Sequence, residues 1–311
     1  MSQSAGNPAQ RVAILMAVYQ GQDYLPVQLR SLIEQHDQRW DLIVGDDGST
    51  DRSLRILQDF AAELQPGRVR IVPGPRAGAA ANFRALLDHV PKDATHVAFS
   101  DQDDAWDPEK ISRSLAALTA DTPAIWCSRV VACDTTMQPL SLSPLPRLEP
   151  SFRHALMQNM VQGNTLMMNR AAFELVRAAN PEAGPVVMHD WWIYQLVTGA
   201  GGQVIYDPLP SVLYRQHDAN VVGANHGIIG RLGGLRRMLA GTYRGWSRMN
   251  HAALTGSAHR LTPENRAILA EFGRLQGSFL QRMQAFRQGG FHRQGRVSQA
   301  ALWLAVLLRR S

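Results

Sequence analysis

The residues best suited to chemistry are Asp101-Gln102-Asp103-Asp104, which directly follow the apolar run 96–99. Three carboxylates this close repel one another unless a cation or hydrogen-bond donors meet them. Oxygen ligands of this kind suit Mg²⁺ or Mn²⁺, which proteins bind through one or two carboxylates together with substrate phosphates. Such an ion neutralises a leaving diphosphate. The alternative is a solvated turn that only caps a helix expected to begin at Pro108.

A second acidic pair, Asp46-Asp47, follows the apolar residues 42–44 and precedes Gly48-Ser49-Thr50. A carboxylate in such a turn can accept a hydrogen bond from a base N–H or a ribose hydroxyl. The same residues are equally well explained as a plain turn in which Ser49 or Thr50 is the N-cap of the next helix.

Apolar runs alternate with segments of helical periodicity over the first third of the chain. We expect strands at 12–18, 42–44, 69–72 and 96–99, and helices at 22–35, from about 50, at 79–90 and from Pro108. This alternation predicts an α/β fold with a parallel sheet covered by helices. Ligands of such sheets bind beyond the carboxyl ends of the strands, which is the edge where both acidic clusters fall.

The later part of the chain has a weaker pattern. We expect strands at 125–132, 163–168 and 204–206, helices at 171–179 and 190–197, and a loop at 140–150. After about residue 225 the pattern changes to helices rich in Arg and Leu, broken at Gly241 and Gly245. We therefore predict an α/β domain at 1–225 and a basic helical region at 226–311.

The composition is that of a globular protein, with 45% hydrophobic and 19% charged residues among 311. Cys127 and Cys133 are expected to be buried, reduced thiols. No apolar stretch approaches the roughly 20 residues that span a bilayer, and the N-terminal sequence has no secretory pattern. We expect a cytoplasmic protein.

The formal charge of +6 comes from an excess of Arg after Gly227. This region, together with the apolar residues 297–308, fits amphipathic helices lying on an anionic membrane surface at the inner face of the cytoplasmic membrane. It fits equally a helical cap on the sheet with its arginines in water. Nucleic acid is not an expected partner, because the basic residues lie far from the acidic edge and have no aromatic platform.

Three stretches in this order resemble family 2 glycosyltransferases of the GT-A fold: Ala17-Val18-Tyr19, Asp46-Asp47-Gly48-Ser49-Thr50-Asp51 and Asp101-Gln102-Asp103-Asp104-Ala105-Trp106. The resemblance runs from about residue 12 to about residue 225. Within the family, Phe99–Asp104 and Tyr214-Arg215-Gln216-His217 are similar to bacterial rhamnosyltransferase-like enzymes of surface-polysaccharide assembly.

The resemblance implies a Rossmann-like, mainly parallel sheet flanked by helices, with a helical C-terminal extension. It implies a metal-dependent, inverting transferase that uses Mn²⁺ or Mg²⁺. The enzyme would move a sugar from a nucleotide-sugar donor to a hydroxyl of a surface-polysaccharide or lipid-linked glycan acceptor. The donor dTDP-L-rhamnose follows from the resemblance alone.

The resemblance also assigns roles to individual residues. The nucleotide sugar would be bound by Ala17, Tyr19, Asp46, Asp47, Asp101 and Gln102. Asp103 would contact the metal directly. His217 is either a metal or diphosphate ligand or a structural histidine. Gly163 and Asn164 would line the acceptor pocket.

The stretch His189-Asp190-Trp191-Trp192 stands where the family has its acidic motif at a helix start. Asp190 would therefore be the catalytic base that takes the proton of the acceptor hydroxyl. This chain has His189 in place of the commoner Glu. Without the resemblance, Asp190 would be interpreted as a helix N-cap. Trp191 and Trp192 cannot face the same way, so one belongs to the core and the other would stack on a sugar or on lipid; Trp191 is the expected acceptor-binding residue.

Two other function classes stay open at this level. A nucleotidyltransferase normally has a Gly-rich, basic loop near its first strand, but residues 17–23 contain only Gly21 and no Lys or Arg. A non-catalytic assembly protein would keep the fold and bind partners through its Arg-rich C-terminal region.

Overall fold

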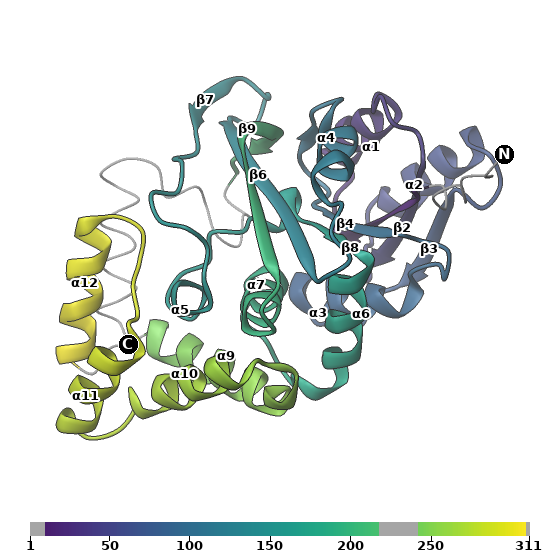
Figure 1. Ribbon diagram of the computed structural model, residues 1–311. Coiled ribbons are helices and arrows are strands. Elements are labelled where there is room, and N and C mark those ends of the chain that lie inside the picture. Colours follow the sequence, from purple (N-terminus) through teal and green to yellow (C-terminus); the bar gives the residue numbers. More distant parts are fainter. Residues whose placement is uncertain (1–9, 218–241, 309–311) are drawn as a thin grey trace, which may run out of the picture.

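The computed structural model describes residues 10–217 and 242–308 (Figure 1). Its nine strands form one sheet. They are β1 (Val12–Val18), β2 (Trp40–Asp46), β3 (Val69–Pro73), β4 (His96–Ser100), β5 (Ala105–Trp106), β6 (Ala124–Cys133), β7 (Pro139–Leu142), β8 (Met167–Asn169) and β9 (Gln203–Arg215). The order across the sheet is β3-β2-β1-β4-β8-β6-β9-β5, and β7 pairs with β6.

The sheet has a parallel half and a mixed half. β1 pairs in parallel with β2 and β4, and β2 pairs in parallel with β3. β8 then joins β4 and β6 in antiparallel pairing, whereas β9 is parallel to β6. The predicted α/β fold is confirmed, and its Rossmann-like parallel part is the half that ends at β4.

Helices cover both faces of the sheet. They are α1 (Leu25–Ile33), α2 (Ser53–Glu63), α3 (Ala79–Leu86), α4 (Lys110–Ala117), α5 (Phe152–Ala155), α6 (Arg170–Ala179), α7 (His189–Gly199), α9 (Thr242–Gly256), α10 (Pro263–Arg274), α11 (Phe279–Gly289) and α12 (Arg296–Leu307). Short 3₁₀ turns lie at Leu87–His89, Gly163–Thr165, Asn180–Glu182 and Ala258–Arg260.

Strand β1 shows how the sheet separates two hydrophobic cores. Val12, Ile14 and Met16 belong to the core shared with α1, α2 and α4. Ala13 and Leu15 point the other way and belong to the core shared with α3, α6 and α7. Since successive strand side chains alternate between faces, an unbroken apolar run is what a strand covered on both faces requires.

The second helix begins later than expected. We predicted an N-cap at Ser49 or Thr50, but α2 begins at Ser53. The backbone N–H groups of this stretch are already used, because Asp46 accepts from Gly48 and Ser49 and Gln20 accepts from Thr50 and Asp51. The prediction was wrong because these side chains hold the segment as a loop.

The fourth helix also begins late, at Lys110 instead of Pro108. Asp107 holds the intervening turn, since its carboxylate accepts from the N–H of Glu109 at 3.0 Å and its carbonyl accepts from the N–H of Lys110 at 3.0 Å. The shift matters for the site, because it makes Lys110 the first residue of α4.

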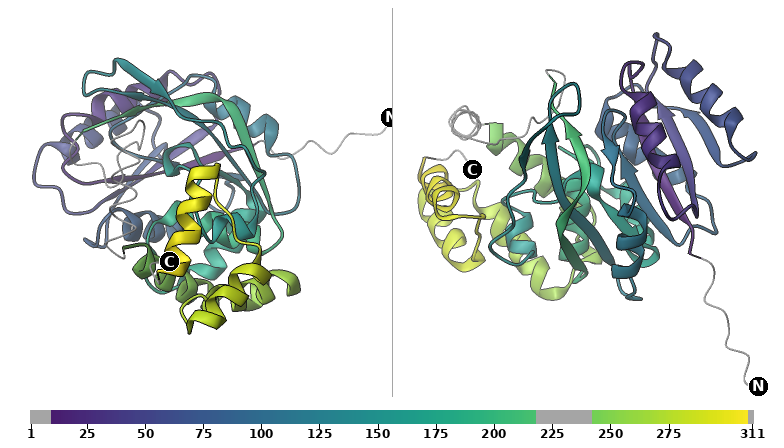
Figure 2. Two further views of the ribbon diagram at one scale, coloured as in Figure 1. Left: turned by 90° about the vertical axis from the view of Figure 1, so that its left-hand side faces the viewer. Right: turned by 90° about the horizontal axis from the view of Figure 1, so that it is seen from above.

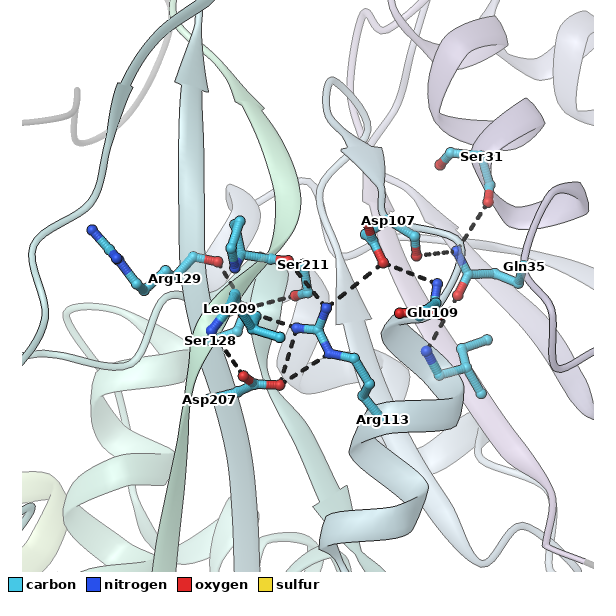
Figure 3. A network of polar contacts seen from close by, with 12 residues as sticks. Ser31, Gln35, Asp107, Glu109, Arg113, Ser128, Arg129, Asp207, Leu209 and Ser211 are labelled. Atoms are coloured by element: carbon cyan, nitrogen blue, oxygen red, sulfur yellow. Dashed lines mark hydrogen bonds and ion pairs between the residues drawn. The ribbon is translucent and has the colours of Figure 1, made fainter.

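Strand β9 is much longer than the predicted strand 204–206, and it continues to Arg215. The prediction stopped too early because Pro208 and Pro210 interrupt the pattern and lack a backbone N–H. Its pairing with β6 is correspondingly irregular around Arg129. Arg113 of α4 bridges this irregular part through its guanidinium, which contacts the Asp207 carboxylate and the carbonyls of Leu209 and Pro210 (Figure 3).

Two smaller expectations also need correction. The loop expected at 140–150 contains β7, which pairs with β6. The strand expected at 163–168 starts as the 3₁₀ turn Gly163–Thr165, and only Met167–Asn169 pair in the sheet. Both differences concern the mixed half of the sheet.

The helices α9 to α12 lie at the end of the molecule opposite β3 (Figures 1 and 2). Leu254, Phe272 and Phe286 belong to the same hydrophobic core as Trp192 of α7. The predicted helical extension is therefore confirmed, and its described helices pack on the rest of the chain. Gly245 lies inside α9, so the predicted break there was wrong. The proposed boundary at 225/226, the break at Gly241 and the arginines at 231–237 lie outside the described residues.

Cys127 and Cys133 are both free and buried, as expected. Burial raises the pKa of each thiol, so neither is a ready nucleophile. Within residues 10–217 and 242–308, every helix is too short or too polar to cross a membrane.

Candidate active site

Side-chain hydrogen bonds join the loops that follow β1, β2 and β4. The N–H of Tyr19 donates to Oε1 of Gln102 at 2.9 Å, and Nε2 of Gln102 donates back to the Tyr19 carbonyl at 3.0 Å. The N–H of Gln20 donates to Oγ of Ser49 at 3.1 Å. The amide of Gln102 is thus occupied by backbone groups, and its predicted contact with the nucleotide sugar stays a prediction. The predicted donor residues lie along one edge of the sheet.

Asp46 and Asp47 use their carboxylates in different ways. Oδ2 of Asp46 accepts from the N–H groups of Gly48 and Ser49, while its Oδ1 is buried and has no partner among the described residues. Asp47 accepts from the N–H of Arg76 at 2.6 Å and from the N–H of Gly78 at 2.9 Å. Each oxygen of Asp47 keeps a second lone pair for a ligand hydroxyl.

Tyr19 and Ala17 lie beside this turn. The Tyr19 side chain is 58% exposed, so its ring is available to a flat ligand such as a nucleotide base. Ala17 is half-buried on β1 and pairs with Gly45 of β2. A small residue there leaves room next to the strand end.

Asp101, Asp103 and Asp104 place carboxylate oxygens within 4.8 Å of one another. Asp104 is fully buried, and its oxygens accept from Nδ2 of Asn164 at 2.6 Å and from the N–H of Arg215 at 3.1 Å. Asp101 and Asp103 are only half-buried. Asp104 therefore forms the base of the cluster, and the other two carboxylates offer the freer oxygens.

The pKa values of this cluster are raised. Burial raises the pKa of Asp101 to about 7, with further contributions from the charges of Asp103 and Asp190, while Lys110 opposes them. Burial, together with the charges of Asp103 and Asp101, raises the pKa of Asp104 well above its usual value. A nearby cation stabilises the ionised form of carboxylates whose pKa is raised in this way. Their oxygen atoms are the ligand type that suits Mg²⁺ and Mn²⁺, so the residues present fit a divalent ion.

Lys110 lies beneath the acidic cluster and was missed by the sequence analysis. Its side chain is fully buried, its Nζ lies 3.4 Å from the centre of the Trp106 ring, and it donates to the Asn164 carbonyl. Burial lowers the pKa of Lys110 well below its usual value, and the charges of Asp104 and Asp101 oppose that shift. The sequence feature that could have indicated this is the spacing of Lys110 four residues before Ser114, which places both on the buried side of α4.

The end of β9, a strand of the mixed half of the sheet, also contacts the acidic cluster. Nε2 of His217 lies 2.7 Å from Oδ2 of Asp103, and the imidazole stacks on the Tyr24 ring at 5.0 Å. Arg215 is buried and donates through Nε to the Asp103 carbonyl at 2.8 Å. His217 and Arg215 therefore fix Asp103 from two directions. Whether His217 also ligates a metal stays a prediction.

Asp190 is the second residue of α7, and Met188 occupies the N-cap position. Its Oδ2 accepts from Nδ2 of Asn159 and from the N–H of Gly163, each at 3.0 Å, and its Oδ1 accepts from the N–H of Trp191 at 2.7 Å. The interpretation of Asp190 as an N-cap was thus wrong. Burial raises its pKa to about 6, although these three donors oppose the shift.

His189 is a buried neutral group next to Asp190. Its ring stacks on Phe83 with 4.1 Å between centroids, and burial lowers its pKa to about 3. A Cβ on Gly163 would lie 3.0 Å from Nε2 of His189. Glycine at 163 therefore lets the backbone pass close enough to donate to Asp190.

The predicted acceptor residues divide into two groups. Gly163 borders the Asp190 carboxylate, and Asn164 is buried beneath Asp104. Trp191 and Trp192 are both buried, and the indole N–H of Trp191 donates to the Ala155 carbonyl at 2.7 Å. The expectation that one of the two tryptophans faces a sugar is therefore wrong, because α7 is covered on all sides by core residues.

The chain is similar in sequence to known proteins. The family model described as "Glycosyl transferase family 2" matches residues 13–177, slightly more than half of the chain. The dTDP-rhamnosyl transferase RfbG of Shigella flexneri is 30% identical over 217 residues, which are 68% of this chain and 74% of that protein.

Solved structures share the fold at low sequence identity. S. aureus TarS 1–349 in complex with UDP-GlcNAc has a TM-score of 0.57 and 14% identity, covering 85% of this chain and 72% of that chain. The mannosyltransferase PcManGT from Pyrobaculum calidifontis, in complex with GDP-Man and Mn²⁺, has a TM-score of 0.53 and 16% identity, covering 99% and 89%. These likenesses confirm the GT-A-like architecture.

Proposed function

The chain belongs to glycosyl transferase family 2 and is a glycosyltransferase, and from this premise we propose that it is an inverting, metal-dependent enzyme. In this proposal it moves a sugar from a nucleotide diphosphate sugar to a hydroxyl group of a glycan acceptor. Residues 1–225 form the catalytic domain and residues 226–311 the basic helical region.

The observation that carries this proposal is the shared location of two acidic centres. The N–H of Gly163 donates to Asp190 at 3.0 Å, and the side chain of the next residue, Asn164, donates to Asp104 at 2.6 Å. The proposed base therefore lies close to the proposed cation site. Asp103 belongs to the same cluster, with its carboxylate held by His217 and its backbone carbonyl by Arg215. A donor diphosphate and an acceptor hydroxyl can therefore meet at one place.

The donor would be held by the loops after β1, β2 and β4. Tyr19 offers an exposed ring for the base, and Asp46 and Asp47 offer acceptors for its polar edge or for the ribose. Asp101 and Asp103 would hold Mn²⁺ or Mg²⁺. The ion, when bound, supplies the positive charge that stabilises a departing diphosphate.

Asp190 would act as the general base. Its pKa of about 6 leaves the carboxylate ionised at neutral pH while keeping it basic enough to accept a proton. Asn159 and the Gly163 N–H hold the carboxylate in one orientation. Removal of the acceptor proton by Asp190 would accompany attack on the anomeric carbon from the side opposite the diphosphate.

The finer assignments follow from similarity. We propose a dTDP-sugar donor, with L-rhamnose as the sugar, because a protein 30% identical to this chain is described as a dTDP-rhamnosyl transferase. We also propose a surface-polysaccharide or lipid-linked acceptor, such as a lipopolysaccharide precursor, and activity at the inner face of the cytoplasmic membrane.

The test is a thermal-shift assay with nucleoside diphosphates, with and without Mn²⁺ or Mg²⁺, followed by hydrolysis of a panel of nucleotide sugars. We expect one nucleoside diphosphate to raise the melting temperature only with metal. Asp103→Ala should abolish that shift, whereas the exposed control Asp59→Ala should keep it. An absence of any shift and any hydrolysis with all donors would instead favour a non-catalytic assembly protein.

A further inference from the structure

Apolar side chains are exposed along one face of α12. Val297 is 78% exposed, Leu308 52%, and Leu304 and Leu307 44% each. We call these four residues, with the partly exposed Trp303, the α12 face. Their spacing of three, four and seven residues places them along one side of a helix. The opposite side of α12 packs into the core through Leu302, Ala305 and Val306.

A second exposed apolar segment lies next to α12. Leu140, Leu142, Leu145 and Leu148 are exposed in and after β7. Gln294 joins this segment to the start of α12, because its Oε1 accepts from the N–H groups of Arg147 and Leu148, each at 2.9 Å. Its Nε2 donates back to the Leu148 carbonyl at 2.8 Å. The two apolar segments are thus held together by one side chain.

A basic pocket of about 540 Å³ lies where the segments meet. Its lining combines basic with apolar side chains, namely Arg147, His292, Arg293 and Arg296 with Leu148, Ala300 and Trp303. The guanidinium of Arg293 lies over the Tyr243 ring at 5.4 Å, and its Nε is buried with no hydrogen-bond partner among the described residues. A buried cationic donor without a partner suits an anionic oxygen.

The charge near this surface is mostly positive. Residues 272–311 contain seven arginines and no Asp or Glu, and Glu149 is the one acid in the segment 139–150. A second copy of the chain would bring the same arginines face to face across a symmetric interface. A negatively charged surface with an apolar interior complements these arginines and leucines better.

We propose that the α12 face and the segment 139–148 dock on a bilayer that contains anionic phospholipids, with a headgroup phosphate in the basic pocket. Arginine forks bind phosphate oxygens, tryptophan favours the interface between water and lipid, and the leucines enter the outer acyl region. This docking rests on the proposed function only in that a lipid-linked acceptor is found at a membrane.

The experiment is co-sedimentation of the full-length chain with lipid vesicles. Vesicles of phosphatidylcholine are compared with vesicles that contain about 30% phosphatidylglycerol. We expect partitioning into the anionic vesicles only, decreasing as salt is raised. Inorganic phosphate at millimolar concentration should not release the protein, which separates docking on a bilayer from binding of a free anion.

Two paired variants test the two parts of the surface. Arg147→Ala with Arg296→Ala should lower partitioning by roughly 25-fold, since each basic residue near an anionic surface contributes about a factor of five. Leu304→Ser with Leu307→Ser should lower it at least tenfold. The controls, Arg30→Ala with Arg55→Ala and Val27→Ser with Leu54→Ser, remove exposed side chains of the same kinds from α1 and α2 and should bind like the unchanged chain.

Thermal unfolding and metal-dependent donor hydrolysis are measured on every variant, and both should stay unchanged. A lack of binding to anionic vesicles by the unchanged chain, or equal binding by α12 and control variants, would overturn the docking surface and leave the proposed transferase reaction intact. Light scattering that shows a dimer lost in Leu304→Ser with Leu307→Ser would assign the face to a second copy instead. Loss of hydrolysis with normal vesicle binding would count against the reaction and not the surface.

Discussion

The two halves of the sheet contribute different things to the site. The parallel half, β1 to β4, is regular and ends in buried or half-buried acids and the exposed Tyr19 ring. The mixed half, β6, β8 and β9 with α7, is irregular and brings the groups that hold those acids, among them Asn164, Arg215 and His217. The parallel half of the sheet therefore supplies the acidic groups, and the mixed half fixes their positions.

The largest expected effect comes from the proposed base, which belongs to the mixed half. Asp190→Asn keeps the shape and can still accept hydrogen bonds through its oxygen, but it cannot take a proton. We expect kcat to fall by roughly 10³-fold, within the range for loss of a general base. The metal-dependent thermal shift with nucleoside diphosphate should remain. A variant with more than a tenth of the original kcat would show that Asp190 is not the base.

Lys110 tests whether the acids of the parallel half depend on a buried partner. Lys110→Met removes the amine that lowers the pKa of Asp101 and whose own pKa is raised by the charges of Asp104 and Asp101. We expect the free energy of unfolding at pH 7 to fall by about 3 kcal/mol, as when one partner of a buried charge pair is lost. Urea unfolding measures this loss.

A second substitution sharpens the same test. Adding Asp104→Asn to Lys110→Met removes a negative charge from the cluster and should recover part of the lost stability. An unchanged free energy of unfolding in Lys110→Met, or a further loss in the double variant, would contradict electrostatic compensation.

Asn159 gives the smallest effect and isolates one donor of the mixed half. Its side-chain N–H lowers the pKa of Asp190 against the larger effect of burial. The base form of Asp190 predominates above about pH 6, so kcat/KM should rise with pH through that value. In Asn159→Ala the pKa of Asp190 should increase. The acidic limb of the kcat/KM profile should therefore move to higher pH by roughly one unit.

The pH–rate profile of Asn159→Ala distinguishes this effect from simple damage. Activity at pH 8.5 should approach that of the unchanged enzyme, because Asp190 is ionised in both. A uniform decrease at all pH values, with no movement of the limb, would show that Asn159 acts only on local structure.

Prediction from sequence succeeded where the signal is local. The apolar runs of β2 and β4 and the acids at their ends could be recognised because strand ends and clustered carboxylates are adjacent in the chain. The start of α2 was misplaced because Asp46 and Gln20 use the N–H groups of residues 48–51. The length of β9 was missed because Pro208 and Pro210 hide a strand that Arg113 stabilises from α4.

The α/β alternation and the position of both acidic clusters at one sheet edge could be derived from the amino-acid sequence, because periodicity and strand polarity are properties of neighbouring residues. The resemblance that singled out Asp190 was also visible in the sequence. The burial of Trp191 in the core and the position of Lys110 under the acids became apparent from the folded structure. It alone showed that Arg215 and His217 hold Asp103 across more than a hundred residues. Burial and long-range hydrogen bonds depend on which segments meet in space, and no spacing along the chain records that.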